Sequence, residues 1–202
     1  TPKTSSAASD VYKRQGYCNM LFKLINEIKE FQATHIAVVF DHKDKTFRSD
    51  IYKDYKANRP PPPDDLVPQF QLIREATEAF GFFAIDKKGY EADDIIATLA
   101  HNATEEGSDV TIFSSDKDLM QLVSENTKMY DPIRNVFIDI DRVKEKFGVT
   151  PDKVIDVQAL IGDKVDNVPG VPGIGVKTAS SLISEFRNVE NLIEKYELIN
   201  KD

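Results

Sequence analysis

The middle of the chain carries the stretch Tyr90-Glu91-Ala92-Asp93-Asp94-Ile95-Ile96-Ala97-Thr98-Leu99-Ala100. We predict that this stretch opens a helix, with three acids in or beside its first turn: Glu91, Asp93 and Asp94. Acidic residues favour that turn because they complement the helix dipole, by about 0.3–1 kcal/mol each. Dipole complementation accounts for one or two acids more readily than for three, and carboxylate clusters occur both in structural networks and in functional sites. Two interpretations therefore stand for this cluster, a helix start and a cation-binding site.

Short apolar runs and helical periodicities alternate on both sides of this stretch. The predicted strands cover residues 35–40, 82–85 and 109–115, the predicted helices 17–31, 66–80 and 91–107, and a predicted hairpin pairs 128–130 with 135–138 around Asp131-Pro132. Continuous apolar runs are typical of strands buried on both faces, whereas apolar spacings of three and four indicate amphipathic helices. Their alternation predicts an α/β fold with a three-layer, mostly parallel sheet.

Acidic residues follow the predicted strands. Asp41 and Asp116 each come directly after a strand, and the helix that opens near Glu91 starts on that same side of the sheet. Ligands of such sheets bind beyond the carboxyl ends of the strands, so we expect the acids to converge there. The eight candidate metal ligands are Asp41, Glu91, Asp93, Asp94, Asp116, Asp118, Asp163 and Asp166.

A purely carboxylate set suits hard cations such as Mg²⁺ or Mn²⁺. More carboxylates than one ion needs indicate two ions, which together stabilise the attacking and leaving oxygens of phosphodiester hydrolysis. Structural alternatives remain for part of the set. Asp116-Lys117-Asp118 is also typical of a capped helix start, more readily for Asp118 than for Asp116, and Asp163 and Asp166 are also typical of a polar loop.

Charge is unevenly distributed along the chain. The net charge of −8 argues against a nucleic-acid binder as a whole. Residues 43–59, however, hold six basic residues against three acids, together with Phe47, Tyr52 and Tyr55. A second candidate is Gly173-Ile174-Gly175, followed by Lys177, because glycines and a helix N-terminus let a phosphate approach the backbone. The alternative for this second segment is a glycine-rich turn between helices.

The remaining features bound the organisation of the chain. A single cysteine excludes an internal disulfide, no apolar segment is long enough to span a membrane, and no signal-peptide core is present, so we expect a cytoplasmic protein. We predict a disordered or foreign leader at 1–15, an α/β core at 16–150 with a basic segment at 43–63, and a helical subdomain at 151–202.

Several motifs occur in the order of a known family: Phe40-Asp41, Phe47-Arg48, Tyr55-Lys56-Ala57-Asn58-Arg59-Pro60, Tyr90-Glu91-Ala92-Asp93-Asp94, Asp116-Lys117-Asp118-Leu119, and Gly162-Asp163 through Lys177-Thr178-Ala179. Over about residues 16–200 the chain resembles the 5′-nuclease domain of bacterial DNA polymerase I, in the flap endonuclease superfamily. The resemblance implies a PIN-like 5′-nuclease fold followed by a helix-hairpin-helix subdomain. It also implies a divalent-metal-dependent 5′→3′ exonuclease and flap endonuclease of DNA replication and repair.

The same resemblance assigns roles to residues. All eight acids would be metal-site residues, and Arg48, Tyr55, Lys56 and Arg59 would belong to a helical arch on the 5′ single strand, with Lys56 and Arg59 catalytic. Gly173, Gly175 and Lys177 would grip duplex phosphates, in this family often around a monovalent cation such as K⁺. The partners implied are DNA and a fused or separate DNA polymerase in a bacterial cytoplasm, without a membrane.

One feature departs from the family's pattern. The family begins with a hydrophobic strand that carries a further metal-binding Asp, whereas residues 1–15 contain no such strand. We therefore expect the first strand to be missing. The chain also stops at Asp202, before the C-terminal helices that the resemblance implies, so we expect the domain to be truncated at both ends. This favours an alternative function, a DNA-binding fragment that does not cleave. A third alternative is a metal-dependent phosphatase of small phosphoesters, which needs neither the basic aromatic segment nor the hairpin.

Overall fold

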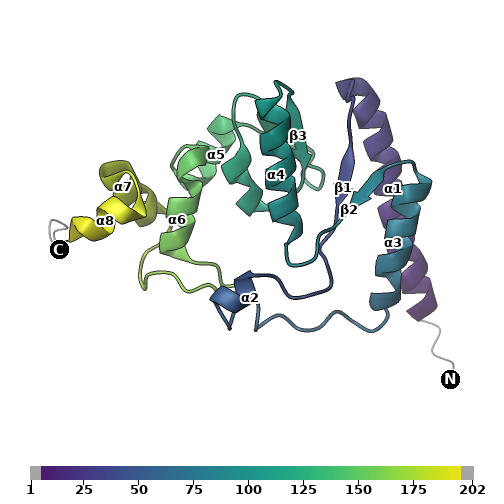
Figure 1. Ribbon diagram of the computed structural model, residues 1–202, viewed down its shortest axis with the longest axis horizontal. Coiled ribbons are helices and arrows are strands. Elements are labelled where there is room, and N and C mark those ends of the chain that lie inside the picture. Colours follow the sequence, from purple (N-terminus) through teal and green to yellow (C-terminus); the bar gives the residue numbers. More distant parts are fainter. Residues whose placement is uncertain (1–5, 197–202) are drawn as a thin grey trace. The chain divides into compact units, whose positions relative to one another are not determined.

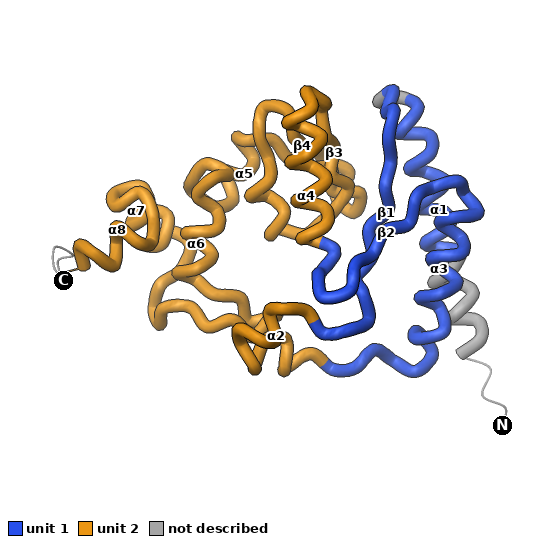
Figure 2. The backbone as a smooth tube through the Cα atoms, viewed as in Figure 1, with its two compact units in different colours: residues 1–45, 60–92 blue, residues 46–59, 93–202 orange. Residues whose placement is uncertain are grey.

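The structure is a computed structural model that describes residues 6–196. Its backbone divides into two compact units (Figure 2). Unit 1 comprises the chain up to Lys45 together with Pro60–Ala92, and unit 2 comprises Thr46–Arg59 together with the chain from Asp93 onward. The predicted basic segment therefore belongs largely to the unit that also contains the C-terminal half.

Unit 1 is a two-stranded parallel sheet packed against helices (Figure 1). Strand β1 (Ala37–Val39) pairs with β2 (Phe83–Ile85), and Phe40 extends the ladder by donating its N–H to Ile85 O at 2.8 Å. Helix α3 (Val67–Ala79) packs against β2 and against α1 (Ser6–Phe31). Both predicted strands are confirmed, each shorter than its apolar run.

The buried face of α3 contains polar residues, which the periodicity does not predict. Gln69 and Thr77 are buried, whereas the apolar Phe70 is 52% exposed. Thr77 is accommodated because its hydroxyl donates to Ile73 O at 2.8 Å and lies 2.5 Å from the hydroxyl of Tyr17 on α1. Buried polar groups are tolerated when they are hydrogen-bonded, and these bonds fix the rotation of α3.

Unit 2 contains a three-stranded mixed sheet. Strand β3 (Val110–Phe113) pairs in parallel with β4 (Thr127–Asp131), and β4 pairs antiparallel with β5 (Val136–Ile138), so the predicted hairpin is confirmed. Its turn is held by Asp131 Oδ1, which accepts from the backbone N–H of Ile133 at 2.9 Å and of Arg134 at 3.1 Å. Helix α4 (Ala92–Glu105) precedes β3, and a 3₁₀ helix, η1 (Lys117–Leu122), follows it.

The described strands form two sheets rather than the single sheet expected from the sequence. Both β1–β2 and β3–β4 have the predicted parallel pairing. A single sheet needs a strand that pairs with a member of each set, and among residues 6–196 no strand does so. The difference therefore lies in connectivity between strands and not in strand direction.

Short helices complete unit 2: α2 (Arg48–Ile51), α5 (Ile140–Phe147), η2 (Pro151–Lys153), α6 (Val154–Ile161), α7 (Val176–Phe186) and α8 (Val189–Glu194). Local signals set several ends. Asp139 caps α5 by accepting from Arg142 N at 3.0 Å, and Gly148 ends it with φ +73°. Neither α2 nor α8 was predicted from periodicity, which is weak for helices of four and six residues.

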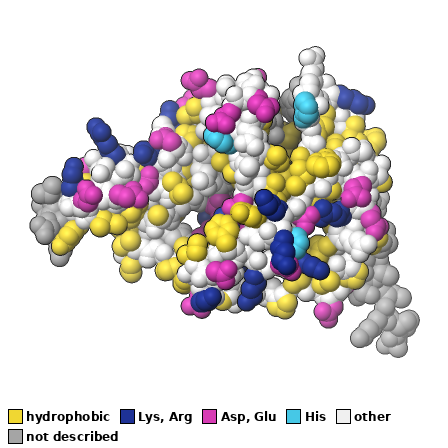
Figure 3. Space-filling model, in the orientation of Figure 1, with side chains coloured by type: hydrophobic (Ala, Val, Ile, Leu, Met, Phe, Trp, Pro, Cys, Tyr) yellow, Lys and Arg dark blue, Asp and Glu magenta, His cyan; other side chains and the backbone are white. Residues whose placement is uncertain are grey.

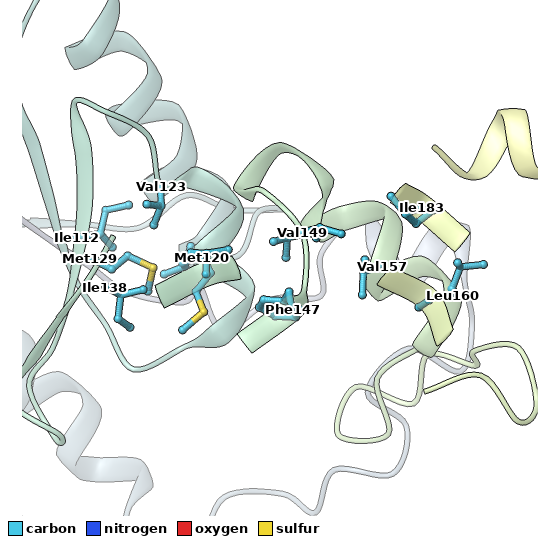
Figure 4. Packing of buried hydrophobic residues seen from close by; sticks show 14 of the residues in the cluster. Ile112, Met120, Val123, Met129, Ile138, Phe147, Val149, Val157, Leu160 and Ile183 are labelled. Atoms are coloured by element: carbon cyan, nitrogen blue, oxygen red, sulfur yellow. The ribbon is translucent and has the colours of Figure 1, made fainter. Parts of the chain in front are cut away.

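One hydrophobic cluster runs through unit 2 from the sheet to the C-terminal helices (Figure 4). Met129 and Ile138 lie at the sheet end, Phe147 and Val149 in the middle, and Ile183 at the helical end. Because the cluster continues through Phe147 and Val149, no break in packing marks the predicted boundary at residue 150. The division at that point stays a prediction from the sequence.

The leader predicted at residues 1–15 stays a prediction. Helix α1 begins within this stretch, at Ser6. Adding residues to an existing helix costs little compared with starting one, and Ala7 and Ala8 are the best helix formers. Residues 1–5 lie outside the described part of the chain. In the described part, none of the helices has the length and apolar character that crossing a membrane requires.

Candidate functional site

The predicted site residues of unit 1 meet at the start of α4. Asp41 lies just beyond β1, and its Oδ1 accepts the backbone N–H of Ala92, the first residue of α4, at 2.8 Å. Glu91 directly precedes that residue. The expectation that an acid at the end of a strand lies beside the helix start is thus confirmed within this unit.

Asp94, in the first turn of α4, is held by an arginine. Arg48 Nη1 donates to Asp94 Oδ2 and Nη2 to Oδ1, both at 2.7 Å, which is the bidentate geometry of strong Arg–carboxylate pairs. The Phe47 ring lies under the guanidinium, 4.8 Å from its carbon. Both charged side chains are partly exposed, at 31% and 21%. Asp93 is partly buried in the same turn.

Asp116 and Asp118 bracket the start of η1. Asp116 caps this helix by accepting from Asp118 N at 2.9 Å, so the helix-start interpretation holds for Asp116, the residue for which it was less favoured. Asp118 Oδ1 accepts a hydrogen bond from Gln158 Nε2 of α6. Burial, and then the negative charge of Asp116, raise the pKa of Asp118, and Lys117 and Gln158 only partly offset this.

Asp163 anchors the loop that follows α6. Its Oδ1 accepts from Val165 N at 2.7 Å, and its Oδ2 accepts from Lys117 Nζ at 2.6 Å. Burial by itself would raise the pKa of Asp163, but the bonds from Lys117 and from the backbone outweigh it and lower the pKa. For Lys117 the directions are reversed. Burial by itself would lower the pKa of Lys117, but the hydrogen bond to Asp163 and the negative charges of the neighbouring carboxylates outweigh burial and raise this pKa. The pair therefore stays ionised and ties the loop to η1.

Asp166 is the point at which the predicted arch residues converge. Arg59 forms an ion pair with Asp166 Oδ1, the Tyr55 hydroxyl donates to Oδ2 at 3.2 Å, and Lys56 Nζ lies 3.9 Å from Oδ2. Three residues assigned from the sequence to the same segment thus surround one acid of the predicted metal set. Figure 3 shows acidic and basic side chains interspersed, not separated into two patches, on the face that it displays.

The predicted hairpin lies between α6 and α7. Gly173 has φ +82°, a conformation that favours glycine, and Gly175 is the N-cap of α7 in an extended conformation. Lys177 is exposed in the first turn of α7, while Ile174 packs against the hydrophobic cluster and fixes the loop. The first N–H groups of a helix have no acceptor inside it, so this turn offers donors beside a lysine.

The structure brings the eight acids together only in part. In unit 2, Asp116, Asp118 and Asp163 interact electrostatically around Lys117. Within the described residues, no three His, Cys, Asp or Glu side chains are grouped as a metal site would require. The chemistry of the donor set nevertheless fits a hard divalent cation, because its donors are carboxylate oxygens. Burial first, and then the negative charge of Asp116, raise the pKa of Asp118, and a bound cation would offset both.

Several residues that shape the site were not predicted from the sequence. Gln158 binds Asp118 across 40 positions, and Asn58 and Asn167 bind backbone carbonyls across more than 100 positions. Spacing along the chain carries no signal at such separations. Lys117 and Asp163 each belong to a motif of the sequence, but their pairing was not predicted.

Comparison with known proteins covers the whole of this architecture. Residues 2–148 match the family model described as 5′-3′ exonuclease, N-terminal resolvase-like domain, and residues 149–202 match that described as 5′-3′ exonuclease, C-terminal SAM fold. The chain therefore belongs to the 5′-3′ exonuclease family.

Individual relatives agree with this assignment. The chain is 55% identical to DNA polymerase I of Rhizobium leguminosarum over 184 residues, which is 89% of this chain and 18% of that protein. It is 44% identical to the 5′-3′ exonuclease of Aquifex aeolicus over 187 residues, 93% of this chain and 64% of that protein. The chain thus spans less than two thirds of the length of either relative.

A solved structure has the same fold. The bacteriophage T5 flap endonuclease, crystallised as a pseudo-enzyme–product complex with DNA and metal ions, superposes with a TM-score of 0.80 at 25% identity. The match covers 94% of this chain and 72% of that one. The predicted 5′-nuclease fold with its C-terminal helical region is confirmed.

Proposed function

We propose that this chain hydrolyses DNA phosphodiesters as a structure-specific 5′→3′ exonuclease and flap endonuclease that depends on two divalent ions, Mg²⁺ or Mn²⁺. The observation that carries this proposal is the match of both 5′-3′ exonuclease family models, which together cover residues 2–202. The relative of known structure supports it, because it was crystallised with DNA and metal ions.

The acids have a defined task in this proposal. Asp41, Glu91, Asp93, Asp94, Asp116, Asp118, Asp163 and Asp166 hold the ions. Divalent ions bound there would supply Lewis-acid stabilisation of the attacking and leaving oxygens. Gln158 and Lys117 orient Asp118 and Asp163 by the contacts described above, so that the carboxylates keep fixed positions.

The basic residues act on the DNA. Lys56 and Arg59 stabilise the negative charge that develops on the scissile phosphate, and this is their catalytic role. Arg48 and Tyr55 engage the 5′ single strand, where the tyrosine ring stacks on a base. Gly173, Gly175 and Lys177 bind phosphates of the duplex through the start of α7 and its lysine, with K⁺ as a monovalent cation at that turn.

The partners follow from the same reasoning. The substrate is duplex DNA with a 5′ flap or 5′ single strand, or a nicked duplex, in DNA replication and repair. A DNA polymerase, fused or separate, acts beside the nuclease, as the name of the Rhizobium relative indicates for that protein. The bacterial cytoplasm is the proposed location.

The test compares two aspartates that cap helices in the same unit. Asp116→Asn removes a predicted metal ligand but keeps a residue that can cap η1, whereas Asp139→Asn makes the same change at the cap of α5. We expect Mg²⁺-dependent cleavage of a 5′-flap DNA, lost in the first variant and retained in the second.

A chromogenic phosphoester, assayed in parallel, separates the alternatives. Cleavage of the small phosphoester without cleavage of the flap would replace the proposal by a phosphatase. Flap binding without cleavage at millimolar Mg²⁺ or Mn²⁺ would replace it by a DNA-binding fragment.

A further inference from the structure

Two segments of unit 2 that lie about 110 residues apart in the sequence are joined through their backbones. Lys56 N donates to Asp166 O at 2.9 Å, Asn58 Nδ2 donates to Lys164 O at 2.8 Å, and Asn167 Nδ2 donates to Asp54 O at 2.7 Å. We call residues 54–59 and 164–167, with these three bonds, the clasp. In Figure 1 the turn after α2 lies beside the loop after α6.

The clasp is reciprocal and involves no charge. Each segment contributes one asparagine, and each asparagine donates to a backbone carbonyl of the other segment. Each segment also contains one residue with a left-handed backbone conformation, Lys56 with φ +57° and Asn167 with φ +58°. Asparagine adopts this left-handed conformation far more readily than lysine does, so Lys56 is held in it by its surroundings.

The charged contacts nearby do not fix this geometry alone. Arg59 is 48% exposed, and ion pairs at such positions contribute little because solvent screens them. The amide bonds instead specify register, since each needs one donor opposite one carbonyl. Displacing a reacting group by about an ångström costs about a hundredfold in rate, so the register of Lys56 and Arg59 matters for chemistry.

We propose that Asn58 and Asn167 are positioning residues, which hold Lys56 and Arg59 in register with the loop that carries Asp163 and Asp166. This inference rests on the proposed nuclease function. Neither asparagine touches a reacting group in this assignment. They act through the backbone. Their bonds join the basic segment at residues 54–59 to the loop at residues 164–167.

The first measurement reads the clasp without catalysis. Asn167→Asp removes the amide donor but tolerates the left-handed backbone, and Asn167→Gly removes the side chain while relaxing the backbone. Neither change alters the sequence around the Lys56–Ala57 bond, so trypsin cleavage there reports local opening of the clasp. We expect both variants of the full chain to be cleaved about five- to tenfold faster, the effect of losing one net hydrogen bond. Asn102→Ala, an exposed asparagine of α4, is the control and should be cleaved at the unmodified rate.

The second measurement reads the positioning role. We expect Asn58→Asp and Asn167→Asp each to lower kcat on a 5′-flap DNA about tenfold with KM changed less than about twofold, because the loss falls on the transition state. Hydrogen exchange at the Lys56 amide should accelerate in both variants.

Each other outcome overturns the inference. Unchanged trypsin cleavage and exchange in both Asn167 variants would show that the amides do not hold the clasp. Faster cleavage with an unmodified kcat, or a change confined to KM, would show that the clasp does not position the reacting groups. An unmodified chain that cleaves no flap DNA with Mg²⁺ or Mn²⁺ would refute the proposed function and the positioning role with it, and the exchange rates would then report only on the clasp.

Discussion

Four glycines near the loop after α6 differ in two properties, which are a positive φ and the space available for a Cβ atom. Gly162 has a positive φ of +68°, and a Cβ added there would lie within 3.0 Å of Gly170 N and Val168 O. Gly170 has the crowding without the positive φ, and Gly173 has φ +82° with nothing within 4 Å. Gly175 has neither feature. Substituting each by alanine therefore separates strain from crowding.

The expected costs follow from these two terms. A strained backbone of the type at Gly162 costs about 1–3 kcal/mol, and overpacking against a backbone that cannot move aside costs about 1–3 kcal/mol more. We therefore expect Gly162→Ala to lower the free energy of unfolding by about 4 kcal/mol and Gly170→Ala by about 2 kcal/mol. Gly173→Ala should cost about 1 kcal/mol, and Gly175→Ala less than about 0.5 kcal/mol.

Urea unfolding followed by far-ultraviolet circular dichroism measures this series. The slope m should stay constant, so that a shift of the midpoint reports stability alone. In thermal unfolding, each kcal/mol should lower Tm by about 2–4 °C for a chain of this size. Equal losses of unfolding free energy in Gly162→Ala and Gly173→Ala would refute the crowding argument. A Gly162→Ala variant as stable as the unmodified chain would refute the close approach of Gly162 to Val168 and Gly170.

Three further predictions concern ions, DNA and a salt bridge. Mg²⁺ at about 100 times its Kd should stabilise the fold by about 2.7 kcal/mol and raise Tm by about 5–10 °C. The rise in Tm should be smaller in Asp116→Asn, and an unchanged rise in that variant would count against a shared metal site. Lys177→Ala should weaken duplex binding and reduce the slope of log K against log salt concentration by about 0.9, whereas Tyr55→Ala should weaken single-strand binding by about 1–3 kcal/mol. Identical behaviour of the two variants on duplex and flap DNA would contradict this division of roles. A double-mutant cycle on Arg48→Ala and Asp94→Ala should give a coupling of about 1 kcal/mol in unfolding, since the pair is bidentate but partly exposed, and additive costs would show that it contributes nothing.

Local features of the fold were predictable because they depend on neighbours in the chain. Strands β1, β2, β3 and β5 lie inside their predicted runs, β4 extends one residue beyond its run at each end, and the hairpin forms around Asp131 as expected. Helix α3 ends before Gly81 and α4 before Gly107, and both glycines have positive φ. Periodicity failed for the inner face of α3, because hydrogen bonds rather than hydrophobicity decide which residues it buries.

The sequence alone proposes a set of residues for the candidate site but not their arrangement. Carboxylates after strands and at a helix start pointed to Asp41, Asp116 and the acids of α4, and the N-terminal family model covers that region. That all eight acids share one metal centre stays a prediction. The partners that hold individual acids, such as Arg48 for Asp94, could not be predicted from spacing along the chain.

The sequence by itself determined the order of the main strands and helices and several of their ends, because glycines, caps and apolar spacing act over a few residues. Tertiary structure alone decided which charges meet, as Lys117 with Asp163, and which amides join Asn58 to Lys164 and Asn167 to Asp54. Such contacts need two segments that are distant in the chain to come within about 3 Å in one orientation. Only packing of the whole unit fixes that geometry, so no local pattern encodes it.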